Sequence, residues 1–298
     1  MAKTRGPAKD QATAKDQGAA KTQATATAAA RTQAEPREVP AAALARLYDL
    51  DLADDPGDLD LYLALAARTG GPVLELMAGS GRLAVPLAVA GHAVVGVDAD
   101  AAMLARGRSA AEAAGRGVAR RLSLVEADAT HYRHVDAGRF GLAFIALGSL
   151  LLLPDRRAQR GAVETLAAHL APGGIAVVDV WMPDAADLAR FDGRLGLEWV
   201  REGDRGAVVT KAMSARHDAA TASIELTTIF EEGRPGEAPA RWIRVDRLSL
   251  LDAATLAEMA EGSGLEVEAL AGDHDLGPLG PGADRIVLVA ARPGSTNG

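Results

Sequence analysis

The chain has 298 residues, a formal net charge of −8 and no cysteine. The lack of cysteine excludes disulfides, thiolate metal sites and a cysteine nucleophile, and it favours a cytoplasmic protein. Residues 1–40 carry seven basic and four acidic side chains, which leaves a net charge of −11 on the rest of the chain. A phosphate backbone finds no positive surface there, so we expect no nucleic-acid partner. No apolar run reaches the roughly 18 residues of a membrane span, so we expect no membrane partner either.

Residues 1–40 repeat a loose Ala-Lys-Asp-Gln unit, as in 8–11 and 14–17. This segment is rich in Ala, Thr, Gln and Lys, has no aromatic residue and offers little surface to bury. Burial therefore cannot offset the entropy that ordering costs. We predict a disordered tail over 1–40 and a second short tail over 295–298.

From Ala41 onward, short apolar runs alternate with helical patterns. Helices are predicted at 41–47, 59–68, 82–90, 101–114, 156–170 and 253–261, and strands at 72–76, 93–97, 121–126, 140–147, 175–181, 265–270 and 285–290. This alternation predicts a doubly wound α/β fold around a parallel sheet. Between about 195 and 250 the pattern changes to β-prone stretches separated by turns, which predicts an inserted antiparallel sheet of three or four strands. We therefore expect one domain, 41–294, that contains this insertion.

A glycine-rich loop follows the first of these strands. Gly79 and Gly81 allow a tight turn and close approach of a ligand to the backbone, and the helix that follows presents free N–H groups. Asp98 ends the second strand about 19 residues later, where a carboxylate can accept hydrogen bonds from both hydroxyls of a ribose. The loop therefore predicts a site for a nucleoside-containing ligand.

Two ligand classes fit this loop. Gly79-x-Gly81-x-x-Ala84 satisfies the fingerprint of dinucleotide-binding proteins, so an NAD(P)-dependent oxidoreductase is one alternative. Glu75, at the end of the first strand, would repel a pyrophosphate but would complement the ammonium and sulfonium groups of S-adenosylmethionine. The charge at this position favours the methyl donor.

Further motifs follow in order along the chain. Asp128 ends the third strand, where it can accept a hydrogen bond from an adenine amino group, and Leu170 to Gly174 form a helix-stop turn before the fifth strand. With these motifs the chain resembles the class I S-adenosylmethionine-dependent methyltransferases of the small-molecule type, from about Tyr48 to Arg292. The resemblance implies a methyltransferase with the Rossmann-like strand order 3-2-1-4-5-7-6 and the insertion after the fifth strand.

The resemblance also implies where the methyl donor binds. The family's cofactor-binding positions fall on these residues: Tyr48, Tyr62, Glu75, Gly79, Gly81, Asp98, Ala99, Met103, Asp128, Ala129 and Leu147. In relatives, the tyrosines close over the methionine end of the donor, and the position of Met103 packs on the adenine. One departure is Met77, where the family usually has glycine; the longer side chain leaves less room at the entry to the loop.

The acceptor is expected to be a small molecule. Residues 146–150 lack the Asn/Asp-Pro-Pro-aromatic signature of nucleobase amino methylation, and no set of ligands favours a metal. His274 is a candidate general base, oriented by a neighbouring carboxylate, although its turn is also typical of a surface turn capped by aspartates. Substrate candidates are Ser149, Trp199, Arg241, Trp242 and Arg244.

The same aromatic and basic residues of the inserted sheet also suit core packing or a homodimer contact. A non-catalytic module that binds the donor for regulation or assembly is a further alternative, because Met77 departs from the family and no base is obvious.

Overall fold

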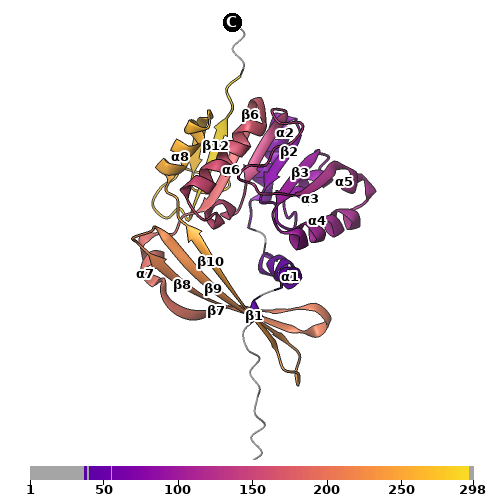
Figure 1. Ribbon diagram of the computed structural model, residues 1–298, viewed down its shortest axis with the longest axis vertical. Coiled ribbons are helices and arrows are strands. Elements are labelled where there is room, and N and C mark those ends of the chain that lie inside the picture. The colour runs from indigo at the N-terminus through magenta and orange to yellow at the C-terminus, as the bar shows by residue number, and fades with distance from the viewer. Residues whose placement is uncertain (1–36, 39, 55, 295–298) are drawn as a thin grey trace, which may run out of the picture. The chain divides into compact units, whose positions relative to one another are not determined.

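The computed structural model describes residues 37–38, 40–54 and 56–294. Its main sheet has seven strands in the order β11-β12-β6-β5-β2-β3-β4 (Figure 1). The strands are β2 (Val73–Leu76), β3 (Val94–Asp98), β4 (Leu122–Glu126), β5 (Phe140–Ile145), β6 (Leu170–Trp181), β11 (Glu266–Ala271) and β12 (Arg285–Ala291). Numbered along the chain within this sheet, they follow the predicted order 3-2-1-4-5-7-6. β12 is antiparallel to both of its neighbours, and the other pairs are parallel.

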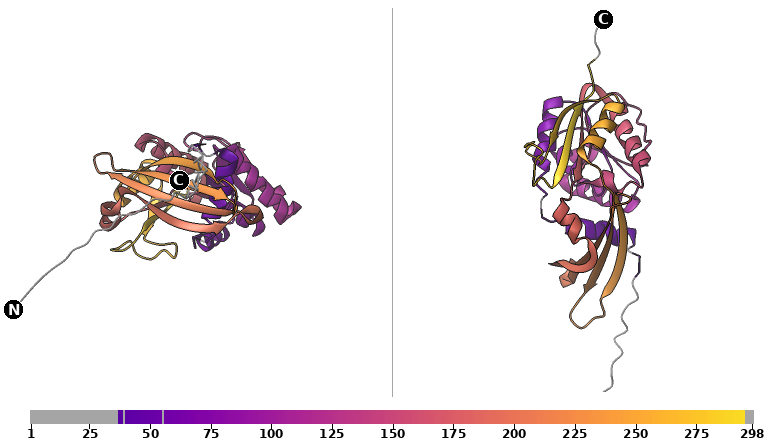
Figure 2. Two further views of the ribbon diagram at one scale, coloured as in Figure 1. Left: turned by 90° about the horizontal axis from the view of Figure 1, so that it is seen from below. Right: turned by 90° about the vertical axis from the view of Figure 1, so that its left-hand side faces the viewer.

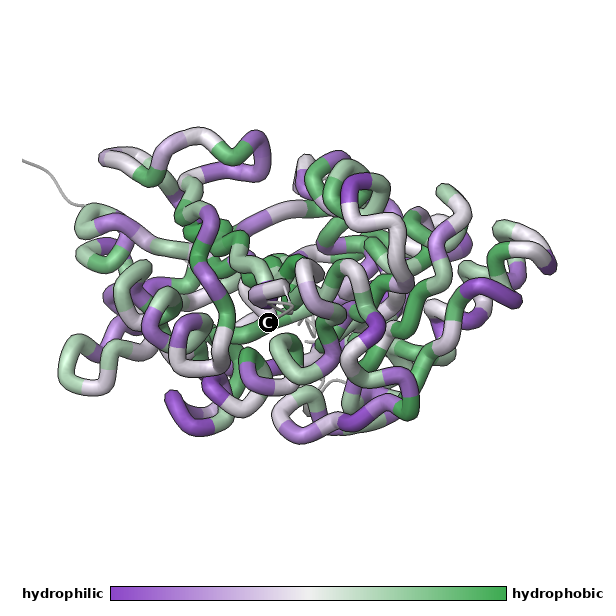
Figure 3. The backbone as a smooth tube through the Cα atoms, turned by 90° about the horizontal axis from the view of Figure 1, so that it is seen from above, coloured by the Kyte–Doolittle hydropathy of each residue, from purple (hydrophilic) through white to green (hydrophobic). Residues whose placement is uncertain are grey.

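Helices cover both faces of this sheet. Side chains alternate along a strand, so Leu74 and Leu76 of β2 join one core cluster and Val73 joins the other. The first cluster includes residues of α6 (Arg156–His169) and α8 (Ala253–Gly262), and the second includes residues of α2 (Leu59–Thr69), α3 (Ala84–Val89) and α4 (Ala101–Ala114). Burial on both faces explains why β5 has no polar side chain and why β2 has only one, that of Glu75. Figure 3 shows hydrophobic segments gathered in the interior and hydrophilic ones toward the outside.

Aspartates begin several of the helices. Asp100 accepts hydrogen bonds from the first turn of α4, Asp155 from that of α6 and Asp252 from that of α8. Two short helices, α5 (Arg116–Arg121) and α7 (Ala185–Arg190), were not predicted. Neither has an apolar face: α5 buries only Val118, and α7 buries no residue. None of the described helices is long and apolar enough to cross a membrane.

The predicted helix-stop turn at Leu170 to Gly174 is part of β6. Leu170 pairs with Phe140 and Ile175 with Leu142, so the four residues between them bulge out of the ladder. Gly173 has a φ of 77°, which accounts for a glycine there. Helix α6 does end at His169, but strand β6 begins at the next residue, with no separate turn between them.

The inserted sheet contains β7 (Asp192–Glu202), β8 (Val208–Asp218), β9 (Ser223–Gly233) and β10 (Ala240–Ser249), with the short helix η2 (Asp204–Gly206) between β7 and β8. These four strands are antiparallel, which confirms the predicted insertion. Strand β1 (Arg37–Glu38) pairs in parallel with β10, within the stretch 1–40 that was expected to form a tail. Apart from Pro40, the rest of that stretch lies outside the described residues, as do 295–298.

Helix α1 (Ala41–Asp51) packs against the inserted sheet (Figures 1 and 2). Leu47 is fully buried in a cluster with Val209 and Phe230. Trp199 Nε1 donates a 2.7 Å hydrogen bond to Asp51 of α1. Helix α1 therefore packs against the inserted sheet, and its Tyr48 lies close to Gly79 of the glycine loop.

Candidate active site

Left-handed backbone conformations at every second residue shape the loop after β2. Met77, Gly79 and Gly81 have φ angles of 60°, 56° and 78°. The Gly79 N–H donates a 2.7 Å hydrogen bond to Oδ2 of Asp98, and the Asp100 N–H donates one of 2.8 Å to Oδ1. Asp98 therefore fixes the glycine loop and the start of α4 at once, while its remaining lone pairs can still accept from a ligand.

Met77 explains why this position usually carries glycine. A left-handed conformation costs a residue with a Cβ roughly 1–2 kcal/mol, and glycine avoids that cost. Met77 adopts it and packs its side chain against the core. The departure noted in the sequence therefore changes the energy of the loop and leaves its course intact.

Glu75 lies buried beneath the loop, and its Oε2 has no hydrogen-bond partner among the described residues. Burial raises the pKa of Glu75 to about 8, although the nearby Arg82 guanidinium opposes the shift. The Tyr62 hydroxyl is also buried and unpartnered within the part of the chain that the structure describes. Burial, with Asp179 and Asp58 close by, raises the pKa of Tyr62 well above its usual range. Unpaired buried polar atoms are rare, so this pair fits a site for a polar ligand.

Two further predicted residues close over the loop. A Cβ placed on Gly79 would lie 3.5 Å from Met103 Cε and 3.9 Å from Tyr48 Cε1. Tyr48 comes from α1, and burial raises its pKa to about 12. The predicted cover over the glycine loop is thus formed by α1 and α4 together.

Asp128 lies after β4, at the same edge of the sheet. Its Oδ1 accepts hydrogen bonds from the backbone and hydroxyl of Thr130, and this backbone bond is the main reason that its pKa lies below the usual range. Ala129 beside it is buried, whereas Ala99, after Asp98, is exposed. Asp128 therefore stays charged and half-exposed, as a hydrogen-bond acceptor for a ligand at the strand ends must be.

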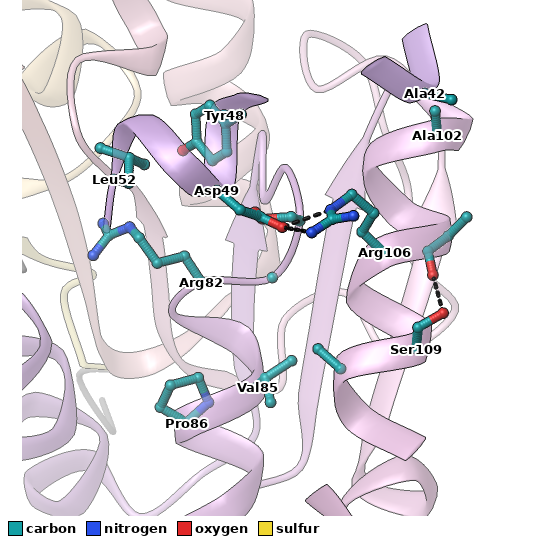
Figure 4. A pocket seen from close by; sticks show the side chains of 14 residues that line it. Ala42, Tyr48, Asp49, Leu52, Arg82, Val85, Pro86, Ala102, Arg106 and Ser109 are labelled. Atoms are coloured by element: carbon teal, nitrogen blue, oxygen red, sulfur yellow. Dashed lines mark hydrogen bonds and ion pairs between the residues drawn. The ribbon is translucent and has the colours of Figure 1, made fainter. Parts of the chain in front are cut away.

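A cavity of about 810 Å³ lies on the outer side of the loop (Figure 4). Asp49 of α1 crosses it, accepting a 2.6 Å hydrogen bond from Ser80 Oγ and one of 2.5 Å from Arg106 Nε. The lining includes Ser80 and Gly81 but none of the three acidic residues predicted to bind the donor. This cavity is the space between α1, α3 and α4.

Five charged or ionisable side chains form a buried array on the side of β6. Arg82 donates bidentate hydrogen bonds of 2.6 and 2.5 Å to the fully buried Asp58. Arg285 donates to both oxygens of the fully buried Asp179, at 3.2 and 3.3 Å, and His274 Nε2 lies 3.1 Å from Asp179 Oδ2. Asp58, Asp179 and His274 have ligand atoms within 4.8 Å of one another, the composition of a small metal site. Both carboxylates already pair with guanidinium groups, however, and these repel a cation.

The array puts the candidate base in a different setting from the one expected. His274 was predicted from its own turn, with an adjacent carboxylate to orient it. The structure supplies that carboxylate from β6, as Asp179, whereas Asp273 accepts a 2.7 Å hydrogen bond from the Gly277 N–H. Leu147 lies on the other side of Asp179 and donates its N–H to Oδ2 at 3.1 Å. Asp58, Arg82 and Arg285 were not foreseen as members of the site.

The substrate candidates of the inserted sheet lie elsewhere. Trp199 and Trp242 pack against the cluster around Leu47, and Arg241 and Arg244 pair with Glu231 and Asp246. Ser149 is the first residue of the short helix η1 (Ser149–Leu152), whose N-cap position is occupied by Gly148. Within the described residues, none of the four candidates on the inserted sheet forms a hydrogen bond or ion pair with the array around His274. Ser149 follows the Leu147–Gly148 turn, which is hydrogen-bonded to Asp179.

Comparisons with known proteins agree with this geometry. Residues 73–174 match a family described as a methyltransferase domain. The methyltransferase CcbJ of Streptomyces caelestis is similar in structure, with a TM-score of 0.69 and 25% identity over 82% of this chain and 96% of CcbJ. No curated protein sequence matches the chain significantly.

Two less similar structures establish the fold. The sugar N-methyltransferase KedS8 of Streptoalloteichus sp has a TM-score of 0.65 and 21% identity over 83% of this chain and 92% of its own. CalS10 of Micromonospora echinaspora, an amino pentose methyltransferase solved with S-adenosylmethionine, has a TM-score of 0.62 and 19% identity over 83% and 96%. These matches do not support the oxidoreductase or the non-catalytic alternative. Residues 73–174 thus form a methyltransferase domain, in a chain with the Rossmann-like fold of the class I, S-adenosylmethionine-dependent methyltransferases.

Proposed function

We propose that this enzyme methylates an amine nitrogen of a small molecule and that His274 is the general base. The observation that carries this proposal is the contact between His274 and the buried Asp179, beside the turn at Leu147. Asp275 of the same turn and Asp284, next to Arg285, are exposed acids that attract a cation. A protonated amine is the small-molecule acceptor that such a rim favours.

The names of two structural neighbours support the same chemistry. KedS8 is a sugar N-methyltransferase, and CalS10 is an amino pentose methyltransferase. Both alignments cover 83% of this chain. We therefore extend nitrogen as the acceptor atom to this enzyme as part of the proposal.

The donor side fits S-adenosylmethionine through its acidic residues. We propose that Asp98 accepts from the ribose, that Glu75 complements the positive charge of the donor, and that Asp128 accepts from the adenine. When bound, S-adenosylmethionine supplies an electrophilic methyl group on its sulfonium. Met103 then covers the adenine, and Tyr48 covers the methionine end and keeps water from the reacting group.

On the acceptor side the protein must remove one proton from the protonated amine. An alkylammonium has no lone pair and cannot attack, so it must lose a proton before or during transfer. His274 accepts that proton, and the neighbouring Asp179 carboxylate stabilises the resulting imidazolium. Methyl transfer then depends mainly on how the protein positions the amine nitrogen relative to the methyl group.

The proposal is tested by incubating the enzyme with S-adenosylmethionine and a panel of small primary and secondary amines, alcohols and phenols. Mass spectrometry should find a gain of one methylene mass on amines, with S-adenosylhomocysteine formed in equal amount. His274→Gln should reduce kcat by about 10²–10⁴-fold, the range for loss of a general base. His217→Gln, on β8 of the inserted sheet, is the matched control and should retain the activity of the wild type. Methylation of oxygen alone, or full activity of His274→Gln, contradicts the proposal.

A further inference from the structure

Asp179 makes more contacts than neutralising its charge requires. It is fully buried near the end of β6, and Arg285 alone could balance the carboxylate. Its Oδ2 nevertheless also accepts from the Leu147 N–H and lies 3.1 Å from His274 Nε2. One carboxylate therefore joins the end of β5, the turn after β11 and the start of β12.

The first of these extra contacts holds a strained turn. Leu147 and Gly148 follow β5 with φ angles of 52° and 70°, and a leucine rarely adopts the left-handed region. The carboxylate of Asp179 accepts a hydrogen bond from the Leu147 N–H. The backbone carbonyl of Asp179 accepts a 2.9 Å hydrogen bond from the Gly148 N–H. Because β5 pairs with β2, this turn lies at the sheet edge that carries the glycine loop.

The second contact determines which nitrogen of His274 is free. Nε2 lies 3.1 Å from Asp179 Oδ2 and 3.0 Å from Arg285 Nη1. Nε2 cannot both donate to Asp179 and accept from Arg285. A lone pair on Nε2 would face the carboxylate lone pairs, whereas an Nε2–H donates to them and leaves Arg285 paired with both oxygens of Asp179. Nδ1 has no hydrogen bond to any residue that the structure describes. Nδ1 is then the nitrogen that carries the lone pair.

We propose that Asp179 is a positioning residue that serves both substrates: it holds the Leu147–Gly148 turn against the reacting end of the donor and holds His274 with Nδ1 as the proton acceptor. This inference rests on the proposed role of His274 as the base. Other charged groups act on His274 as well. Arg285 of β12 and Asp58, before α2, face it across the array, and Asp273 and Asp275 flank it on its own turn.

Asp179→Asn tests the role in activity. With both substrates saturating, kcat should fall at least 30-fold, and the acidic midpoint of its pH profile should move to lower pH, because an amide does not stabilise the imidazolium. Asp136→Asn, which removes an exposed partner of Arg139 just before β5, is the matched control and should stay within twofold of the wild type with an unchanged profile. In the double variant Asp179→Asn/His274→Gln, the losses in kcat should be far from multiplicative, as they are for residues that act as a unit.

Nitrogen-15 NMR of labelled wild-type enzyme gives a readout that needs neither activity nor a stable variant. Neutral His274 should carry its proton on Nε2, and the opposite tautomer overturns the inference. So does a folded Asp179→Asn enzyme with wild-type kcat and pH profile. Full activity of His274→Gln instead overturns the proposed base, whatever the tautomer, so the two failures can be told apart.

Discussion

We expect the protonation state of the Glu75 side chain to be linked to binding of the donor. Burial raises its pKa to about 8, so in the free protein it is mostly neutral at pH 7. A cationic donor beside it favours the carboxylate and lowers that pKa, so binding at pH 7 releases a proton. By linkage, donor affinity should rise with pH by up to about tenfold per unit until pH 8 and then level off.

Calorimetry measures this proton release directly. At pH 7 the observed enthalpy of S-adenosylmethionine binding should differ between phosphate and Tris buffers, because the released proton protonates buffers of different ionisation enthalpy. Glu75→Gln should bind more weakly and show no difference between buffers. Glu112→Gln, at an exposed position of α4, is the control and should behave as the wild type. Buffer-independent binding by the wild-type enzyme would show that Glu75 does not take part.

Met77 gives a second prediction for a single residue. Its φ of 60° is strained for any side chain and most strained for a β-branched one. Met77→Val should therefore be destabilised by about 1–2 kcal/mol relative to Met77→Gly in urea unfolding, although valine buries more apolar surface. Equal stability of the two variants would mean that the loop adopts another conformation in solution.

Helix α1 connects the inserted sheet to the donor loop. Its Leu47 is buried against the insertion, and its Asp51 accepts hydrogen bonds from Trp199 and Lys211. On its other side, Tyr48 lies over Gly79, and Asp49 accepts from Ser80. A change on the side of α1 that faces the inserted sheet should therefore alter the affinity of the enzyme for the donor.

Leu47→Ala tests this coupling because Leu47 lies outside the predicted donor site. Removing a buried leucine costs about 2–5 kcal/mol in general, and here it should loosen α1 first. Hydrogen exchange of α1 should rise and donor affinity should fall at least threefold. Val245→Ala, at a largely exposed position of β10, should change neither. Unchanged affinity alongside faster exchange in α1 would show that the helix does not cover the donor.

The elements of the main sheet follow from local patterns. Glycine or proline lies shortly before and after the runs that form β2 and β5, and the predicted limits of both strands lie within two residues of the observed ones. Helices α5 and α7 were missed because neither has the apolar face that a periodic pattern detects. Strand β6 starts five residues earlier than predicted, because a bulge at Gly173 allows pairing through a sequence that indicates a turn.

The residues of the candidate site also fall into those that the sequence predicts and those that it does not. The glycine loop and Asp98 were predictable because their residues lie close in the chain, 19 positions apart at most. The pairs Arg82–Asp58 and Arg285–Asp179 span 24 and 106 residues. Nothing in the spacing of these residues marks them as partners, since only the packing of α2 and β12 on the sheet brings them together.

At the scale of the whole molecule, the inserted sheet ends in a free edge. Among the residues that the structure describes, strand β7 pairs only with β8, and its Leu195, Leu197 and Val200 are more than half exposed. An apolar edge strand exposes unpaired backbone groups that a second copy can pair antiparallel about a twofold axis. We therefore predict a homodimer through β7.

Light scattering coupled to size-exclusion chromatography measures this assembly. The wild type should have twice the monomer mass at micromolar concentration, and Leu195→Glu/Leu197→Glu should be monomeric with donor affinity unchanged. Arg190→Glu, on the exposed α7, is a charge-changing control that should remain dimeric. A monomeric wild type contradicts the predicted use of this edge.

The central claim is that S-adenosylmethionine binds over the glycine loop, with Asp98 at its ribose. Calorimetric titration of the wild type and Asp98→Ala with S-adenosylmethionine, S-adenosylhomocysteine and NAD⁺ tests it most directly. The account predicts one site per chain for the first two ligands, at least tenfold weaker binding by Asp98→Ala, and no binding of NAD⁺. Wild-type affinity in a folded Asp98→Ala, or binding of NAD⁺ in place of the methyl donor, would contradict it.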